Sequence, residues 1–396
     1  MENLGSYCII LAALTLVSSV TRIDAAVAMF VFGDSLVDTG NNDYITSIAR
    51  ANFLPNGIDY PTRIPTGRFC NGLIISDLIS EYMGTEPILP ILDPNAKGQN
   101  LLRGANFASA GAGILDDTGV IFIERLTIPQ QIQLFQKYQN DVANLIGPAA
   151  TTTLISQALF SITIGGNDYI NNYLLPLSVR AQQYTPAQYN QLLIATFRNQ
   201  LTQIYNLGAR KLTVSNIGPL GCIPSQLSMK AIRTECIPEL NEYASNFNAA
   251  LKPMLQELNR ELPGAMFVYG NGYDMIFGII NNPGNYGILF LPEALPYVRT
   301  ILIYWQVGLK IRSELYNHLF CHSGFEASTT ACCGQGSYNG VLVCTVLSNI
   351  CPDRSKYVFW DPFHPTEAVN RLLTDRLLNG PPSDISPINI KELLAL

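Results

Sequence analysis

The sequence is poor in charged residues. Only 14% of its 396 residues are Asp, Glu, Lys or Arg, against roughly 25% in an ordinary soluble domain. The net charge is −6 and no run of Lys and Arg occurs. The chain therefore lacks the basic patch with which proteins bind nucleic acid or another polyanion, and we expect no nucleic-acid partner.

Motifs of several other protein classes are missing as well. No pair of cysteines has the C-x₂-C spacing of a zinc knuckle, and no G-x-S-x-G sequence marks the nucleophile elbow of the common α/β-hydrolases. Gly111-Ala112-Gly113 lacks the third glycine of a dinucleotide-binding loop. No N-x-S/T sequon is present, so N-glycosylation is not expected.

The N-terminus carries an apolar run, Tyr7 to Val20, which is followed by the small residues Ala25 and Ala26. This pattern predicts a secretory signal peptide over residues 1–25, although no Lys or Arg precedes the run; the alternative is a buried N-terminal helix. No later stretch supplies the ~18 uninterrupted apolar residues of a membrane span. We therefore expect a soluble, exported product.

The nine cysteines are compatible with an oxidising compartment. Cys222 and Cys236 bracket a loop, and four others cluster near the C-terminus: Cys332, Cys333, Cys344 and Cys351. We predict disulfides rather than a zinc site and leave their pairing open. Cys8 lies in the leader, and among the remaining cysteines we expect at least one free thiol, with Cys70 as the candidate.

Short apolar runs alternate with longer amphipathic segments. Strands buried on both faces of a parallel sheet are predicted for four runs: Ala26 to Phe32, Ala158 to Gly165, Lys211 to Gly218 and Ala265 to Asn271. Helical spacing of apolar residues predicts helices over Ile128–Leu145, over Leu240–Leu258, and from Pro365 to a stop at Gly380. This alternation indicates one doubly wound α/β domain.

Two segments far apart in the chain carry the residues of acyl transfer. Ser35 follows the first predicted strand, so it should lie at the carboxyl end of the sheet, where open α/β folds bind ligands. His364 is one of only three histidines, and Asp361 precedes it by three residues. A nucleophile, a base and an anion that orients the base are thereby available. Taken alone, Ser35 could equally be a helix cap and His364 a turn residue.

Two glycine-containing segments could supply donors for an oxyanion. Asn106 to Gly111 ends in a residue without a side chain, and Ile164 to Asp168 offers the amide of Asn167 at the end of a strand. An acyl intermediate needs hydrogen-bond donors aimed at its oxygen. Either segment alone would more often be an ordinary turn.

In this order, FGDSLVDTGNN, NFASAGAG, IGGNDY and DPFHPTE resemble the conserved blocks of the GDSL esterase/lipases of the SGNH-hydrolase superfamily, and most closely its plant-type secreted branch. The resemblance runs from about Ala28 to Gly380. It implies a three-layer α/β/α sandwich, flavodoxin-like, that needs neither cofactor nor metal. It also implies Ser35 as nucleophile, His364 as base oriented by Asp361, and an oxyanion hole formed by Ser35, Gly111 and Asn167.

One stretch, residues 288–324, departs from this pattern. Its removal would join Tyr286-Gly287 to Phe325-Glu326, as in the family. His318, Cys321 and His322 lie in it, but three candidates without a fourth make a poor metal site. We interpret the stretch as an atypical insertion that arose from a retained intron or a misjoined exon. The hydrolase domain is then expected over residues 26–380, with a C-terminal tail over 381–396.

Together these features predict a secreted serine esterase or lipase that hydrolyses carboxylic (acyl) esters through an acyl-enzyme on Ser35. Its partner would be a small-molecule or lipid ester, and we expect a monomer in the apoplast or cell wall. An acyltransferase would use the same residues with an alcohol in place of water. A non-catalytic secreted binding protein is the alternative from another class.

Overall fold

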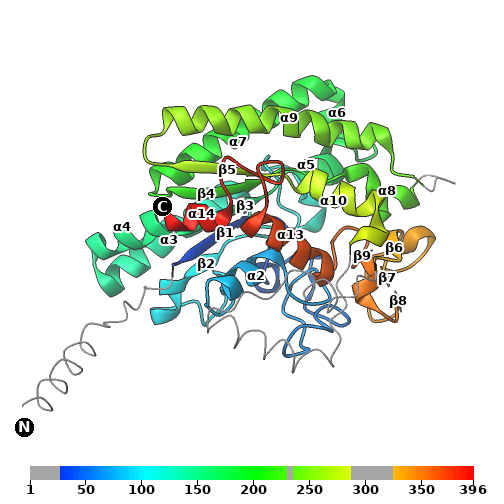
Figure 1. Cartoon of the computed structure of the whole chain (residues 1–396), viewed down its shortest axis with the longest axis horizontal. Helices are drawn as coiled ribbons and strands as arrows, with labels where there is room; N and C mark the ends of the chain where they lie inside the picture. Colours follow the sequence, from blue (N-terminus) through cyan, green and yellow to red (C-terminus); the bar gives the residue numbers. More distant parts are fainter. Residues whose placement is uncertain (1–26, 230–234, 287–323) are drawn as a thin grey trace, which may run out of the picture.

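The computed structural model describes residues 27–229, 235–286 and 324–396. Its centre is a six-stranded sheet in the spatial order β10-β5-β4-β3-β1-β2, of which Figure 1 labels β5 to β2. The strands are β1 (Met29–Gly33), β2 (Gly104–Asn106), β3 (Leu159–Thr163), β4 (Lys211–Ser215), β5 (Met266–Gly270) and β10 (Ile385–Ser386). All neighbours pair in parallel except β10, which is antiparallel to β5. The four predicted strands are thus confirmed as β1, β3, β4 and β5.

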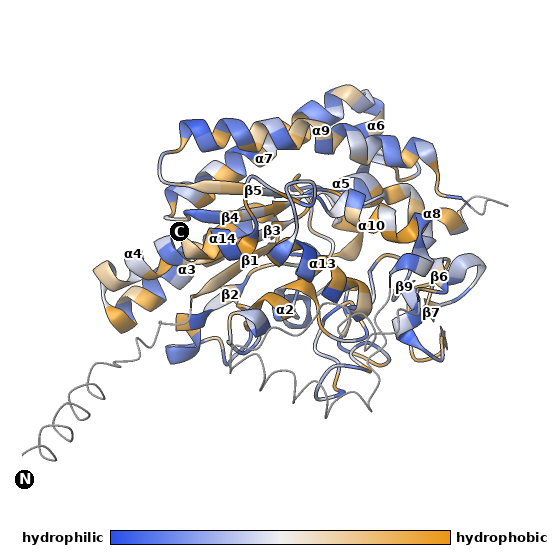
Figure 2. Ribbon diagram, viewed as in Figure 1, coloured by the Kyte–Doolittle hydropathy of each residue, from blue (hydrophilic) through white to orange (hydrophobic). Residues whose placement is uncertain are grey.

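The helices begin where the sequence offers caps. Thr127 and Gln130 form a capping box at the start of α3 (Ile128–Ile146). The Thr366 hydroxyl accepts the Val369 N–H at the start of α13 (Glu367–Asn379). Helix α13 therefore begins at Glu367, two residues after the Pro365 that we expected in its first turn. Apolar and polar residues alternate along α7 and α9 (Figure 2), as expected of helices with one buried side.

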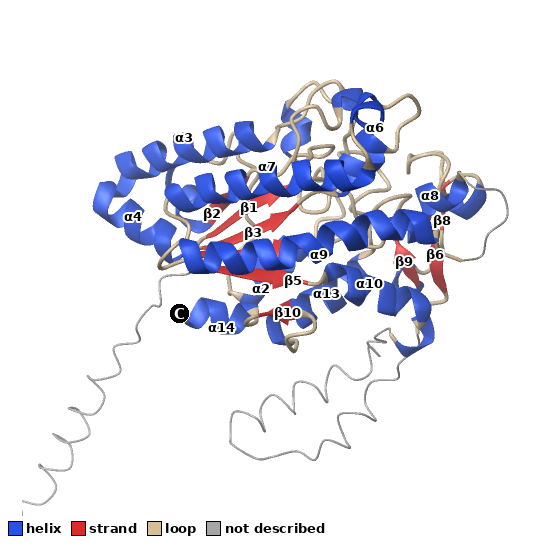
Figure 3. Ribbon diagram, turned by 90° about the horizontal axis from the view of Figure 1, so that it is seen from above, coloured by secondary structure: helices blue, strands red, loops and turns tan. Residues whose placement is uncertain are grey.

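The helices form two layers, one on each face of the sheet (Figure 3). One layer contains α3 (Ile128–Ile146), α7 (Pro186–Asn206) and α9 (Pro238–Glu261), and the other contains α2 (Ile75–Tyr82), α10 (Gly272–Asn281), α13 (Glu367–Asn379) and α14 (Ile390–Ala395). Shorter helices are α4 (Pro148–Gln157), α5 (Gly166–Asp168), α6 (Val179–Gln183) and α8 (Pro224–Ser228). The expected three-layer α/β/α sandwich with a mostly parallel sheet is confirmed.

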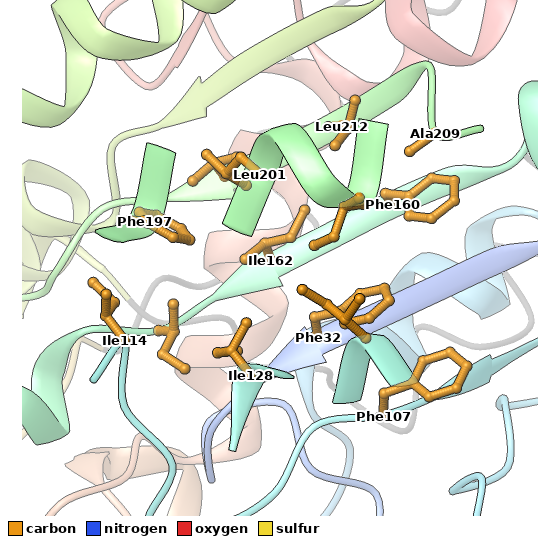
Figure 4. Packing of buried hydrophobic residues seen from close by; sticks show 14 of the residues in the cluster. Phe32, Phe107, Ile114, Ile128, Phe160, Ile162, Phe197, Leu201, Ala209 and Leu212 are labelled. Carbon is orange, nitrogen blue, oxygen red and sulfur yellow. The ribbon is translucent and has the colours of Figure 1, made fainter. Parts of the chain in front are cut away.

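Strand β1 is buried on both faces and divides the core. Phe30 and Phe32 belong to the cluster under α3, α7 and α9, whereas Met29 and Val31 belong to the cluster under α10 and α13. The ring centroids of Phe32 and Phe107 are 5.0 Å apart, and both residues are labelled in Figure 4. Packing on both sides fixes the position of β1 and of the turn that follows it.

Residues 381–396, expected as a tail, are built into the same fold. Strand β10 extends the central sheet at the outer edge of β5, and α14 packs beside α13. Ile385, Ile390 and Leu393 are all buried. The expected boundary at Gly380 was wrong, because a two-residue strand and a six-residue helix give too short a pattern to be recognised.

Three disulfides confirm the interpretation of the cysteines. They join Cys222 to Cys236, Cys332 to Cys351 and Cys333 to Cys344, while Cys70 is a free, buried thiol. The last two bridges hold a small unit made of β6 (Ala327–Ala331), β7 (Cys333–Gly334), β8 (Asn349–Ile350) and β9 (Tyr357–Phe359). The Cys333 N–H donates to the Trp360 carbonyl at 2.7 Å, so this unit supports the chain just before Asp361.

The predicted signal peptide, Cys8 and nearly all of the 288–324 segment lie outside the described residues. The described residues on either side of it, Tyr286 and Phe325, lie next to each other. The Phe325 N–H donates to the carbonyls of Pro283 at 2.8 Å and Tyr286 at 2.9 Å. We propose that the fold is complete without residues 288–324, because the described residues before and after this segment contact each other.

Deletion of residues 288–324, which joins Gly287 to Phe325, should therefore keep the fold and the activity and raise the soluble yield. The shortened chain needs little rearrangement at the junction, and it loses Cys321, which could mispair with Cys332 or Cys333. Both forms should be expressed side by side and compared by soluble yield and thermal unfolding. A shortened form that unfolds at a much lower temperature would identify the segment as a structural element.

Candidate active site

Ser35 lies just beyond the carboxyl end of β1, as predicted. The turn that carries it is pressed against β3: the Asp34 N–H donates to the Thr163 carbonyl at 3.2 Å. A Cβ atom on Gly33 would lie 2.1 Å from that carbonyl oxygen, at a φ of +149°. Glycine at position 33 therefore allows the chain to turn close to β3 and to present a partly exposed Ser35.

His364 and Asp361 lie on the loop between β9 and α13 and are both buried. One oxygen of Asp361 accepts the backbone N–H groups of Phe363 and His364, each at 2.8 Å. The Trp360 N–H donates to the His364 carbonyl at 2.8 Å, and the Phe69 ring lies 5.0 Å from the imidazole, centroid to centroid. The loop and the packed ring fix the orientation of the imidazole.

The structure brings Ser35, His364 and Asp361 together across 329 positions of sequence. The imidazole Nε2 lies 2.7 Å from the Ser35 Oγ, and Nδ1 lies 2.8 Å from both Asp361 oxygens. A carboxylate at Nδ1 favours the tautomer that carries its proton there, which leaves the Nε2 lone pair facing the hydroxyl. This arrangement can remove the proton of Ser35.

The two backbone donors expected for an oxyanion hole are available. Among the described residues, none accepts a hydrogen bond from the N–H of Ser35 or of Gly111. Gly111 has a φ of +85°, and a Cβ atom there would lie 2.4 Å from the Phe122 ring. A side chain at position 111 would strain the backbone and clash with the Phe122 ring. The loop therefore requires glycine at this position.

The side chain of Asn167 is held in one orientation. Its Nδ2 donates to the Ala112 carbonyl at 2.9 Å, and its Oδ1 accepts a hydrogen bond from Asn171 at 2.7 Å. An amide nitrogen carries two protons, so one donor of Asn167 remains for a ligand. Ser35, Gly111 and Asn167 all line the same cavity as His364, and its volume is about 540 Å³.

Buried acids that the sequence analysis did not single out position these loops. Asp168 accepts the N–H groups of Ile114 at 2.8 Å and Leu115 at 3.0 Å, and the Thr118 hydroxyl at 2.7 Å. It thereby ties the segment after Gly111 to the helix that carries Asn167. The only signal for it in the sequence is its place directly after Asn167.

Asp38 has the same role in the loop that follows Ser35. It accepts the N–H groups of Gly40 at 2.7 Å, Asn41 at 2.8 Å and Ala110 at 3.1 Å. The Ala110 carbonyl also accepts a hydrogen bond from Asn42 at 2.9 Å. The loop after Ser35 and the loop before Gly111 are therefore joined by side chains that the sequence motif contains but whose partners it does not reveal.

Within the described ranges, no group of three or more His, Cys, Asp or Glu side chains could hold a metal ion. His318, Cys321 and His322, the weak metal candidates of the sequence, lie outside those ranges. In the part of the chain that the structure describes, no helix is both long and apolar enough to cross a membrane.

Comparison with known proteins now decides the family. The family model described as GDSL-like Lipase/Acylhydrolase matches residues 29–377. The chain belongs to the GDSL esterase/lipase family. A protein from Arabidopsis thaliana, GDSL esterase/lipase At4g28780, is 46% identical over 374 residues, which cover 94% of this chain and 92% of that protein. GDSL esterase/lipase LTL1 from the same plant is 43% identical and covers 93% of this chain and 91% of its own length.

Family membership makes this GDSL protein a hydrolase of ester bonds. A further relative matches over nearly its whole length: GDSL esterase/lipase At1g71250 of Arabidopsis thaliana is 36% identical over 100% of this chain and 97% of its own. The resemblance noted in the sequence is thus confirmed for the family and its plant branch. It leaves the individual substrate and the roles of the site residues to be argued from the geometry.

Asp34 allows a test of the electrostatics next to Ser35. Burial raises the pKa of its carboxyl to about 7, against the opposing effects of the Leu36 N–H and of His364. Below pH 4 the carboxyl is protonated in both the folded and the unfolded chain. Between pH 4 and 7 the carboxyl ionises only in the unfolded chain. The contribution of Asp34 to the free energy of unfolding is therefore fully present at low pH and is lost as the pH rises towards 7.

The free energy of unfolding of the wild type should therefore fall relative to that of Asp34→Asn between pH 4 and pH 7. At about 1.4 kcal/mol for each pKa unit, the change could reach about 4 kcal/mol. Urea unfolding at several pH values measures it, with Asp141→Asn, on the exposed side of α3, as the control. If the free energies of unfolding of wild type and Asp34→Asn changed in parallel between pH 4 and pH 7, the carboxyl would be ionised in the folded protein over this range.

Proposed function

We propose that this protein is a serine esterase that hydrolyses carboxylic esters through an acyl-enzyme on Ser35. The observation that carries the proposal is the 2.7 Å contact between the Ser35 Oγ and His364 Nε2, with Asp361 at the opposite nitrogen of the ring. The two unpaired backbone donors and the Asn167 amide beside it support the same chemistry.

In the proposed first half-reaction, Ser35 Oγ attacks the ester carbonyl carbon while His364 Nε2 takes the hydroxyl proton. The carbonyl oxygen becomes an oxyanion, which accepts hydrogen bonds from the N–H groups of Ser35 and Gly111 and from Asn167 Nδ2. The C–O bond to the alcohol then breaks, and His364 returns the proton to the departing alkoxide. The acyl group remains on Ser35.

In the second half-reaction, water takes the place of the alcohol. His364 removes a proton from it, hydroxide adds to the acyl carbon, and collapse of the second tetrahedral intermediate returns the proton to Ser35 Oγ. Asp361 holds the imidazole and stabilises its charged form without being protonated itself. The products are a carboxylic acid and an alcohol, and the enzyme is regenerated.

We further propose that the protein acts after export. Three disulfides within the described residues favour an oxidising compartment, and the apolar N-terminal run of the sequence is the expected export signal. An extracellular ester would then be the substrate.

Ser35→Ala should lower kcat for p-nitrophenyl acetate hydrolysis by about 10⁶-fold while the fold is kept, because a partly exposed serine contributes little packing. An organophosphonate should label Ser35 in the wild type. The control is Ser156→Ala on α4, outside the cavity lining, which should keep full activity. Activity that survives Ser35→Ala, or label on another serine, would refute the acyl-enzyme.

Asp361→Asn should lower kcat by about 10⁴-fold, because the amide oxygen can still accept the backbone N–H groups but no longer stabilises the imidazolium. The wild-type rate should also fall as the medium is acidified, since a protonated His364 cannot take the Ser35 proton. The measurement is kcat against pH for both forms, with circular dichroism to check the fold. Near-full activity of Asp361→Asn would mean that another group orients the base.

A further inference from the structure

The segment from Arg68 to Leu73 lies beside the loop that carries His364, and it contributes one aromatic side chain, Phe69, to the cavity at Ser35. Phe69 is half-buried. Its ring centroid lies 5.0 Å from that of the His364 imidazole, with 35° between the two ring planes. Rings at this distance and angle lie partly over one another, because rings that lie side by side would be farther apart. The imidazole therefore lies against the face of the Phe69 ring.

One end of this segment is fixed to α2 by a buried ion pair. The Arg68 guanidinium donates through Nε and Nη2 to the two Asp77 oxygens, each at 2.8 Å, and both side chains are almost fully buried. The third nitrogen, Nη1, donates to the Thr66 hydroxyl at 2.9 Å. A bidentate pair of planar groups fixes direction as well as distance. The backbone next to Phe69 is therefore held in one place.

The other end of the segment is fixed to the start of α13. The Asn71 Oδ1 accepts the Glu367 N–H at 2.9 Å, and the Leu73 N–H donates to the Glu367 carboxylate at 3.2 Å. Helix α13 directly follows the loop of His364 in the chain. The segment that carries Phe69 and the loop that carries the imidazole are thus joined to the same helix end.

The charge of the imidazole changes during the proposed reaction. It is neutral before the attack and positive while it holds the Ser35 proton. The face of an aromatic ring carries negative partial charge and attracts a cation that lies over it. The contact with Phe69 is therefore stronger in the charged intermediate than in the resting enzyme, and only a difference of this kind raises the rate of the chemical step.

Several titratable or charged side chains surround His364. They are Asp361 on its own loop, Asp34 after β1, Arg68 and Cys70 beside Phe69, Arg50 in the cavity lining and Glu367 on α13. Burial raises the pKa of the Cys70 thiol, so it carries no charge at neutral pH, and Arg68 is paired with Asp77. Replacing Phe69 by another uncharged residue leaves all of these groups in place. A change in the pH dependence of the rate would then report the loss of the ring.

We propose that Phe69 is a positioning residue for His364, and that its ring stabilises the imidazolium that forms when the Ser35 proton is taken. This inference rests on the proposed function, because it needs an imidazole that gains and loses a proton in each cycle. It adds Phe69 to the residues that determine the rate, although Phe69 has no group that can exchange a proton.

Two substitutions separate the effect on charge from the effect on packing. Phe69→Leu keeps an apolar side chain but removes the aromatic face, whereas Phe69→Tyr keeps that face. Phe69→Met, which also lacks a ring, replaces Phe69→Leu if that variant does not fold. The control is Phe53→Leu: Phe53 lines the same cavity, but among the described residues the rings next to the imidazole are those of Phe69 and Phe363.

The experiment measures kcat and KM for p-nitrophenyl acetate against pH, for wild type and each variant. Rates are divided by the fraction of sites that an organophosphonate titrates, and circular dichroism checks the fold. Phe69→Leu should lower kcat by about tenfold with little change in KM, and should move the acid limb of kcat/KM to lower pH by about one pH unit. The limb moves in this direction because an imidazolium without the ring loses its proton more readily. Phe69→Tyr and Phe53→Leu should keep the wild-type acid limb.

A rate of Phe69→Leu that falls equally at every pH, with the acid limb unmoved, would overturn the proposal, because the ring would then act by packing alone. Wild-type kinetics of Phe69→Leu, or a Phe69→Tyr variant that behaves like Phe69→Leu, would overturn it as well. Failure of the proposed function is a different result: wild-type protein would not hydrolyse the ester and would leave Ser35 unlabelled.

Discussion

The close contact between the Gly33 turn and β3 is the constraint on which the site depends. Strand β1 is enclosed by core on both faces, so its end can move little, and the Asp34 N–H fixes the turn to Thr163. His364 arrives from the opposite end of the chain on a loop with its own internal hydrogen bonds. Two separately supported segments thus hold Ser35 Oγ and His364 Nε2 2.7 Å apart.

Buried carboxyl groups connect the loops around this contact. Among the described residues, Asp38 and Asp168 form no ion pair, and they accept backbone N–H groups instead. Burial raises the pKa of Asp38 to about 7 and that of Asp168 to about 6, although these N–H groups lower both values. These hydrogen bonds connect the loop after Ser35, the segment around Gly111 and the helix that carries Asn167, so the positions of the three residues are coupled.

The sequence allowed the prediction of β1, β3, β4 and β5, because uninterrupted apolar runs of strand length between turn residues have few other solutions. It also indicated Ser35, Asp361, His364, Gly111 and Asn167 as candidates, since their motifs are local. It could not reveal β2 and β10, which are three and two residues long and acquire their structure from neighbouring strands. Nor could it reveal the partners of Asp168, because those contacts join distant segments.

The hydrogen bond between Tyr286 and Phe325 makes this junction a suitable place for inserted sequence. A segment whose two ends emerge side by side constrains its host only through the entropy of closing a loop, which grows by about 0.6 kcal/mol for each doubling of length. The junction lies between α10 and the disulfide-bonded unit, and neither flanking residue lines the cavity at Ser35. We therefore expect sequence added at this junction to leave Ser35 and His364 in place, so that the fold could acquire a second module there.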